Sequence, residues 1–253
     1  MIYDLQKASM WKRISAFLFD AIILGIVAVL CAWLLSVVTG FDGHYATLEE
    51  SYARYEAEYG VKFDLTMAEY ESLDEAGLAR LDEAYQALSE DQTAVRSYNM
   101  VTQLTLLITT IGIFMGFLLM EFAVPLLFKN GQTLGKKIFG LGVMRTEGIK
   151  INGVCLFIRS VLGKYTVETM VPVLLLIMIF SGTIGIVGPL VIGLILLLNL
   201  ILMIATRTNS PIHDLLANTV TVDLASQMIF DTKEDLIAYK EKAHLEKVKN
   251  TVY

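Results

Sequence analysis

Residues 14–38 read ISAFLFDAIILGIVAVLCAWLLSVV, and this stretch decides the fold. It exceeds the roughly 20 apolar residues that a helix needs to cross a hydrocarbon core of about 30 Å. It is too long for a signal-peptide core and no small-residue cleavage site follows it, so we expect a retained membrane span. Its one carboxylate, Asp20, lies about two helical turns after Arg13, which places both residues on one helix face. A charge at bilayer depth is costly, so this face must meet water, another helix or a counter-charge.

Two further blocks of the 253-residue chain are equally apolar. Residues 99–128 suit one span, whereas 165–206 are too long for one, because 171–206 alone would make a helix of roughly 54 Å. The stretch SGTIGIVGP at 181–189 carries three glycines and a proline, so we expect a hairpin of two spans, with one tilted span as the alternative. With 55% hydrophobic residues and a mean hydropathy of +0.58, the chain is predicted to be an all-α polytopic membrane protein of about four spans.

The charges are segregated along the chain and predict its topology. Residues 39–98 hold 14 acidic and 4 basic residues, a net charge of −10, whereas 129–164 hold 7 basic and 1 acidic residue, a net charge of +6. Because Lys and Arg near span ends stay in the cytoplasm, the basic loop and residues 1–13 are expected inside and the acidic segment outside. We therefore expect both termini inside, in a bacterial cytoplasmic membrane. Cys31 in the first span and Cys155 in the basic loop are expected to form no disulfide.

Two polar segments are predicted to be helical. In the acidic segment, residues such as Leu73 and Tyr85 recur at helical spacing, so we expect two or three short amphipathic helices broken at Gly60. They form either a solvated helical hairpin or a vestibule that attracts cations. In the tail, a capping pattern from Asp231 to Glu234 predicts a charged surface or self-association helix over roughly 232–248. The predicted segments are therefore the N-terminus and first span (1–38), an acidic insertion (39–98), the second span (99–128), a basic cytoplasmic loop (129–164), the hairpin of spans (165–206), a cytoplasmic motif (207–223) and a charged tail (224–253).

Three sequence pieces that adjoin the spans carry a family resemblance. In chain order they are WKRISAFLFDAIIL (11–24), GQTLGKKIFGLGVM (131–144) and SPIHDLLANTVTVD (210–223). Together they resemble the RDD family of integral membrane proteins, which is named for one arginine and two aspartates. The resemblance assigns these residues to Arg13, Asp20 and Asp214. It implies a transport function, including cation/proton exchange for some members.

The resemblance covers about 8–38 and 99–223, and it leaves out the acidic insertion and the tail. One departure is Asn218, where members of the family usually carry glycine. Asparagine also tolerates unusual backbone angles, so we expect the local fold to be kept. Within the covered part, Leu141–Arg145 and Thr219–Asp223 each look like a short strand, and we expect them to pair as a small cytoplasmic sheet.

The motif after the second span is predicted to lead the chain along the membrane surface. Gly131 and Gly135 are expected to let the chain turn, and Lys136 and Lys137 to face anionic lipid headgroups, at about 1 kcal/mol per basic residue. A phosphate-binding loop is rejected because the spacing does not match a Walker motif. Further polar residues of the cytoplasmic motif are Gln132, Thr133 and His213.

Asp20 has two interpretations. It is either a structural clamp that hydrogen-bonds another helix, or a carboxylate in a wet cavity that binds a proton or a small cation. Glu121 and Glu168 favour a shared site, because each precedes a proline by four residues and so lies near a freed backbone carbonyl, and Asn199 adds an amide. Alternatively, both glutamates lie at the cytoplasmic interface, where Lys164 pairs with Glu168.

Arg13 and Asp214 are both predicted at the cytoplasmic rim, where an arginine–carboxylate pair is geometrically natural. Such a pair either locks the first helix to the chain after the last helix, or breaks and forms as a gate. His213 can titrate near neutral pH, although such a histidine more often packs or donates to a backbone carbonyl. No metal-ligand companions are visible, because His44 is expected outside and His244 lies in the tail.

The expected function is that of a small secondary transporter coupled to cations or protons, in which Asp20 binds the ion and Arg13 and Asp214 set its charge state or gate it. The alternative is a non-catalytic membrane scaffold or accessory subunit whose arginine and aspartates stabilise the bundle. Expected partners are the lipid bilayer, a monovalent cation or proton, and a second copy or another membrane protein. No nucleophile–base pair, metal set or nucleic-acid motif is visible, so we expect no enzyme activity, cofactor or nucleic-acid partner.

Overall fold

The computed structural model describes residues 8–206 and 208–251, and residues 1–7, 207 and 252–253 lie outside this part. The chain divides into two compact units, residues 1–28 with 114–253, and residues 29–113, and each is described by itself. Four helical stretches in the described part are long and apolar enough to cross a membrane: Met10–Thr39, Gln92–Leu127, Gly153–Phe180 and Val187–Ala205. This confirms the four-span prediction and the hairpin in place of one tilted span.

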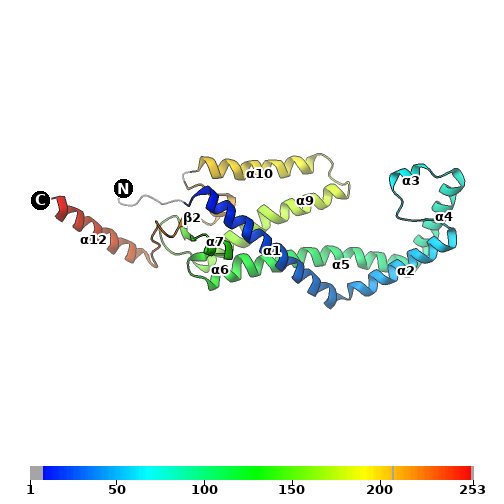
Figure 1. The fold of residues 1–253 in the computed structure, drawn as a ribbon, viewed down its shortest axis with the longest axis horizontal. Coiled ribbons are helices and arrows are strands. Elements are labelled where there is room, and N and C mark those ends of the chain that lie inside the picture. Colours follow the sequence, from blue (N-terminus) through cyan, green and yellow to red (C-terminus); the bar gives the residue numbers. More distant parts are fainter. Residues whose placement is uncertain (1–7, 207, 252–253) are drawn as a thin grey trace. The chain divides into compact units, whose positions relative to one another are not determined.

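Helices α1 (Met10–Thr39) and α5 (Gln92–Phe117) each run through both units (Figure 1). They pack closely because small residues face each other. A Cβ built on Gly116 would lie 3.1 Å from the Ala28 Cβ in the first unit, and one built on Gly112 would lie 3.0 Å from the Ala32 Cβ in the second. Such close approach of backbones is typical of helix pairs in membranes, where packing replaces the hydrophobic effect.

The third span begins earlier than the sequence indicated. It runs through α8 (Gly153–Phe157), a π-helix η3 (Ile158–Met170) and α9 (Val171–Phe180), so the basic loop ends before 153 rather than at 164. The Asn152 side chain starts the helix by accepting a hydrogen bond of 2.8 Å from the Cys155 N–H. Arg159 and Lys164 lie inside this span because acidic partners neutralise them, as shown below.

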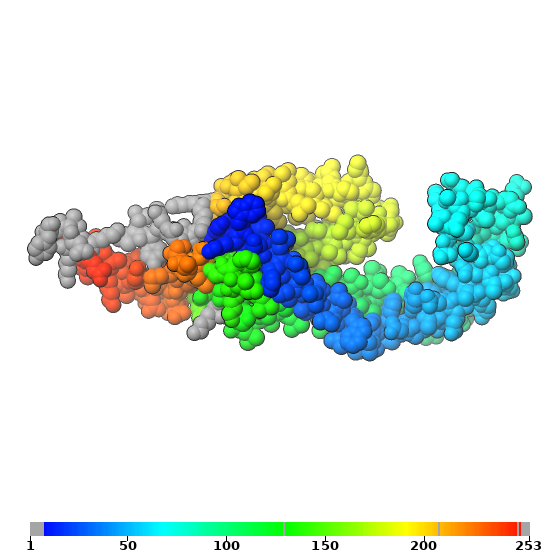
Figure 2. Space-filling model, viewed as in Figure 1, coloured from blue at the N-terminus to red at the C-terminus, as the bar shows by residue number. Residues whose placement is uncertain are grey.

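The last span, α10 (Val187–Ala205), returns beside α9 after a turn in which Gly182 and Gly185 have positive φ angles of 70° and 53° (Figure 1). The hairpin surface, yellow in Figure 2, is rich in exposed apolar side chains. Leu174, Leu190 and Leu197 are each at least half exposed, which is the expected condition of side chains that face lipid.

A small sheet lies beside the helix ends of the first unit. Strands β1 (Leu141–Arg145) and β2 (Thr219–Asp223) pair antiparallel, as predicted, with Leu141 opposite Asp223. The strands are buried along most of their length, and Asn218 enters β2 with a φ of 51°. Asparagine therefore adopts the left-handed conformation that glycine would otherwise supply, and the expectation for this departure is confirmed.

Short elements complete this end of the first unit. They are the π-helix η1 (Leu118–Ala123), α6 (Val124–Leu127), the 3-10 turn η2 (Lys129–Gly131), α7 (Leu134–Ile138) and α11 (Ile212–Leu216). The predicted tail helix is α12 (Lys233–Thr251), and it begins one residue later than proposed, because the Thr232 hydroxyl accepts the Asp235 N–H at 3.1 Å. Leu236 of α12 packs in a small core with Ile149 and Phe230.

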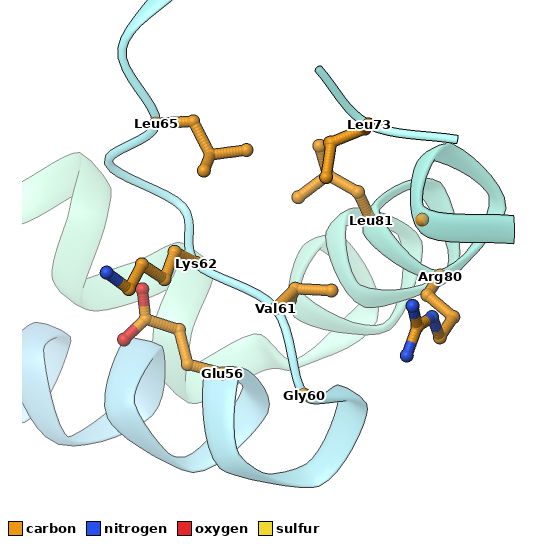
Figure 3. Close-up of a pocket in the computed structure, with 9 residues that line it drawn as sticks. Glu56, Gly60, Val61, Lys62, Leu65, Leu73, Arg80 and Leu81 are labelled. Carbon is orange, nitrogen blue, oxygen red and sulfur yellow. The ribbon is translucent and has the colours of Figure 1, made fainter. Parts of the chain in front are cut away.

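The second unit contains the predicted amphipathic helices α2 (Phe41–Tyr59), α3 (Met67–Glu71) and α4 (Glu75–Glu90). Gly60 ends α2 with a φ of 64°, which confirms the predicted break. A cavity of about 460 Å³ lies between the loop after α2 and α4, with Leu65, Leu73 and Leu81 converging on it and Lys62 and Arg80 at its rim (Figure 3).

Candidate functional site

Asp20 is held by the chain that follows the second span. Its Oδ2 accepts a hydrogen bond of 2.5 Å from the Thr133 hydroxyl, and its Oδ1 accepts one of 2.7 Å from the Gly135 N–H. A Cβ on Gly135 would lie only 2.3 Å from the Ala16 carbonyl oxygen, so only glycine permits α7 to approach α1 this closely. Gly131 turns the chain with a φ of 58°, as predicted, whereas Gly135 provides this close approach rather than a turn.

Thr133 connects Asp20 to Lys136. While its hydroxyl donates to Asp20, the same oxygen accepts hydrogen bonds from the Lys136 backbone N–H at 3.4 Å and from Nζ at 3.2 Å. Burial, with Arg159 as a further cause, lowers the pKa of Lys136 to about 8, although Glu121 and Asp20 oppose this change. The prediction that Lys136 faces lipid headgroups is therefore wrong. Lys137 is exposed, with its Nζ 4.0 Å from the centre of the Phe128 ring.

The π-helix η3 determines which side chains of the third span face the site. In an α-helix, Lys164 would lie about 140° and Glu168 about 180° around the axis from Arg159. The i→i+5 hydrogen bonds of a π-helix widen the turn, so successive residues are separated by a smaller angle than in an α-helix, and residues four or five apart lie near one side. Arg159, Lys164 and Glu168 then share one side, and each meets a different partner.

Arg13 and Asp214 form the predicted pair, but they are not alone. The Asp214 carboxylate is fully buried, with Oδ2 3.6 Å from an Arg13 guanidinium nitrogen and Oδ1 2.8 Å from the Arg159 Nε. Thr219 also donates to Oδ1 at 2.8 Å, and Arg13 donates to the Asn209 carbonyl oxygen at 2.6 Å. Despite burial, the cations Arg159 and Arg13 and the neighbouring His213 hold the pKa of Asp214 well below its usual range.

His213 lies between Glu168 and Arg159. Its Nδ1 is 2.8 and 3.0 Å from the two Glu168 carboxylate oxygens, its backbone N–H donates to Glu168 at 3.0 Å, and its Nε2 is 3.2 Å from an Arg159 guanidinium nitrogen. Burial lowers the pKa of His213, and the contacts with Glu168 and Asp214 oppose this change without cancelling it.

Glu121 and Asn199 have partners of their own. Lys164 donates to the Glu121 carboxylate, and Ser160 donates to the Glu121 backbone carbonyl at 2.6 Å. This is the carbonyl that Pro125 was expected to free, since proline has no N–H to donate. The Asn199 amide oxygen accepts the Ile212 N–H at 3.1 Å, which ties α10 to α11.

The structure thus gives the predicted site residues separate partners rather than one shared cavity. The four groups expected to cluster, Asp20, Glu121, Glu168 and Asn199, contact α7, Lys164, His213 and Ile212 respectively. In place of the expected pairing of Lys164 with Glu168, Lys164 forms an ion pair with Glu121, and Glu168 contacts the His213 ring. Within the described residues, no group of three His, Cys, Asp or Glu side chains is arranged to hold a metal ion.

Arg159 is the main residue that sequence reasoning missed. In the sequence, Arg159 belongs to the basic segment 129–164, whose charge predicts the orientation of the protein in the membrane but indicates no partner for this arginine. The available signal was a second arginine near the start of the third span, on the side where Asp214 was expected. The π-helical register that brings it to Asp214 has no signature in the sequence.

The site as a whole is a balanced charge network at the sheet end of the first unit. Four cationic side chains and four carboxyl groups lie on or next to membrane helices: Arg13, Lys136, Arg159 and Lys164, with Asp20, Glu121, Glu168 and Asp214. Arg13 and Arg159 form ion pairs with Asp214, Lys164 forms one with Glu121, and Asp20 is linked to Lys136 through Thr133. Ion pairing of this kind is what makes charges tolerable at membrane depth. The fold and the network define a multi-pass membrane protein with a buried ionic cluster.

A sequence model of a protein family matches most of the chain. The RDD family model matches residues 7–218, and the chain belongs to the RDD family. The three motif residues of the family resemblance, Arg13, Asp20 and Asp214, lie in the network described above. Comparisons with curated proteins and with solved structures gave no match.

Proposed function

We propose that the protein is a small secondary transporter in which cation and proton binding compete at the charge network. The observation that carries this proposal is the set of eight ionisable side chains that lie on or next to membrane helices. Ionisable residues in membrane segments are costly and often mark ion or proton pathways. A purely structural link between helices would need far fewer charges.

Glu168 is the ion-binding carboxylate in this proposal. It lies on the third span, is partly exposed, and its main partner is His213, a titratable side chain. Glu121 forms an ion pair with Lys164, and Asp214 forms ion pairs with two arginines, so the charges of these two carboxylates are already neutralised. Arg13 then acts as a lock between α1 and α11 rather than as a gate.

Asp20 has a holding role in this proposal. Both of its oxygens have short hydrogen bonds to one neighbouring segment, and Gly135 leaves no room between that segment and α1. A group so fully engaged is suited to fixing α7 against the first span, and the clamp interpretation is therefore favoured over ion binding.

A membrane scaffold or accessory subunit is the second candidate. The hydrogen bonds of Asp20 to the neighbouring segment suit a scaffold equally well. The cavity in the second unit, with Lys62 and Arg80 at its rim, offers an apolar recess for a partner (Figure 3). In this case the network stabilises the bundle and no ion moves. Under either candidate we propose a non-enzymatic role.

Orientation and assembly are part of the same proposal. We propose that the sheet end lies in the cytoplasm, most simply of a bacterium, because the basic residues near it favour that side of the membrane. We also propose a homo-oligomer, because a four-span unit is small. A cysteine introduced at Ser226 should react only with a membrane-permeant thiol reagent in intact cells, and one at Ser89 with an impermeant reagent. The opposite pattern would reverse the orientation.

The function is tested with the purified protein in liposomes that contain a pH-sensitive dye. Gradients of Na⁺, Li⁺ or K⁺ should drive proton movement in the wild type and in Glu147→Gln, an exposed control. Glu168→Gln should abolish it while the protein still folds. Folded wild type that moves no protons under any of these gradients would refute cation/proton exchange and leave the scaffold as the better account.

A further inference from the structure

The contacts of His213 determine its protonation and tautomer. An arginine guanidinium only donates hydrogen bonds, so the Nε2 atom 3.2 Å from Arg159 must be the acceptor. The proton of the neutral ring then lies on Nδ1 and is donated to Glu168. In this state the His213 ring carries no net charge.

A glycine of the third span fixes the position of His213. A Cβ on Gly163 would lie 2.7 Å from both the Cα and the Cβ of His213, so α11 rests directly on the η3 backbone. The ring is therefore held between Glu168 and Arg159, which lie on either side of Gly163 along the same helix. Only small ring movements are available to it.

An unused acceptor lies next to the ring. The Asp214 Oδ2 atom is fully buried and has no hydrogen-bond donor, and it lies 3.9 Å from His213 Nε2. Buried carboxylate oxygens normally have donors. Its Oδ1 is already occupied by Arg159 and Thr219, whereas Oδ2 is ion-paired with an Arg13 guanidinium nitrogen at 3.6 Å, beyond hydrogen-bond length, and can still accept a hydrogen bond.

We propose that His213 is the proton-binding group of the site. Protonation of Nε2 breaks its hydrogen bond with Arg159, and the new N–H donates to Asp214 Oδ2 instead. A proton on Nε2 would point at the Arg159 guanidinium, which cannot accept it. The nearest acceptor is Asp214 Oδ2, and a ring movement of about 1 Å closes the 3.9 Å gap to hydrogen-bond length. The step adds one proton, and it breaks no covalent bond.

Burial opposes the protonation of His213, whereas the carboxylates around it favour protonation. From η3 it faces the Glu168 carboxylate and the Arg159 guanidinium, and from α11 it faces Asp214, behind which lies Arg13 of α1. Burial lowers the pKa of His213, with the Arg159 guanidinium as a smaller cause, and the two carboxylates oppose this change without cancelling it. A proton and a cation then compete through Glu168, because an imidazolium neutralises the carboxylate that a cation would need. This last step rests on the proposed function, whereas the proton site does not.

The test is an NMR titration of the full chain in lipid nanodiscs with ¹⁵N-labelled histidine. The three histidines are assigned by His44→Gln and His244→Gln. At alkaline pH we expect the His213 proton on Nδ1, and on acidification a second proton on Nε2. A neutral ring that carries its proton on Nε2 would overturn the proposal.

Two variants test the acceptor. Removal of the charge in Asp214→Asn is expected to lower the proton affinity of His213 about tenfold, because a nearby opposite charge shifts a pKa by about one unit or more. An unchanged titration in folded Asp214→Asn would overturn the transfer to Oδ2. If this variant does not fold, the ¹³Cγ signal of Asp214 in the wild type replaces it. That signal should move together with the His213 titration, and a constant signal would contradict the transfer.

Added Na⁺ separates this inference from the proposed function. Under exchange, Na⁺ should lower the proton affinity of His213 in the wild type and have no effect in Glu168→Gln, since linkage is reciprocal. A His213 titration that keeps its tautomer and its response to Asp214 but ignores cations would uphold the proton site and refute its coupling to transport.

Discussion

Buried charged side chains in this protein are stabilised by specific neighbours rather than by solvent. Asp20 has a hydroxyl and a backbone N–H, Glu121 has Lys164, and Asp214 has two arginines. Removing one member therefore costs more than the mean strength of a hydrogen bond, because the remaining partner stays buried and unsatisfied.

Replacement of Asp20 by alanine should destabilise the protein by about 2–5 kcal/mol, because it leaves the Thr133 hydroxyl and the Gly135 N–H without an acceptor. Thermal unfolding of the purified protein in one detergent measures the effect. Asp231→Ala, which changes a side chain that is 80% exposed, should stay within about 0.5 kcal/mol of the wild type. Equal melting temperatures for both variants would contradict the clamp.

The lowered pKa of Lys136 predicts that the folded protein becomes more stable at alkaline pH. The folded Lys136 pKa of about 8 lies below its ordinary value of 10.5, so between these values the unfolded state binds more protons and stability rises with pH. From about pH 7.5 to about pH 9.5 the gain should be on the order of 1–2 kcal/mol. Chemical unfolding at both pH values measures it, and the gain should disappear in Lys136→Met. A gain of the same size in that variant would assign it to other groups.

Helices and their contacts were predictable to different degrees. The four spans follow from the length and hydropathy of each block, the two strands from their composition, and the Arg13–Asp214 pair from its place at two span ends. The π-helices were not predictable, because they depend on how each backbone hydrogen bond shifts in the packed bundle. The partners of Lys164, Glu168 and Arg159 follow from that register, so these contacts were missed with it.

The contact between α7 and α1 predicts a severe effect of Gly135→Ala. The added Cβ would meet the Ala16 carbonyl oxygen at 2.3 Å, and the backbone of neither element can move without breaking the hydrogen bonds of Asp20. We expect a loss of about 3 kcal/mol or failure to fold. Gly25→Ala in α1 is the matched control, since nothing lies within 4 Å of its Cβ. Size-exclusion profiles after heating compare the two, and similar profiles would contradict the packing.

The contact between η1 and η3 is tested by a double-mutant cycle on Glu121 and Lys164. Lys164→Met leaves the buried Glu121 carboxylate without its main partner and should cost about 3–5 kcal/mol. Adding Glu121→Gln removes the uncompensated charge, so the double variant should be more stable than Lys164→Met alone. Denaturant unfolding of all four proteins gives the interaction energy. Additive effects would place the two side chains apart.

The molecule combines a rigid lock with one group that can change its charge. Arg13, Asp20, Arg159 and Asp214 hold the first and third spans to the chain segments at the sheet end. His213 and Glu168 lie within this lock and are the pair whose charges can respond to protons and cations. Membership of the RDD family establishes the membrane fold. The division of its charged residues into structural and ion-responsive groups is our proposal.

A side-by-side comparison of Asp20→Asn and Glu168→Gln in liposomes tests this division most directly. Cation-driven proton flux and melting temperature are measured for each variant, with flux normalised to folded protein. The account predicts that Asp20→Asn melts earlier but keeps its flux per folded molecule, whereas Glu168→Gln remains folded and loses its flux. A stable Asp20→Asn protein without flux, beside an active Glu168→Gln protein, would contradict the account and return the ion site to Asp20.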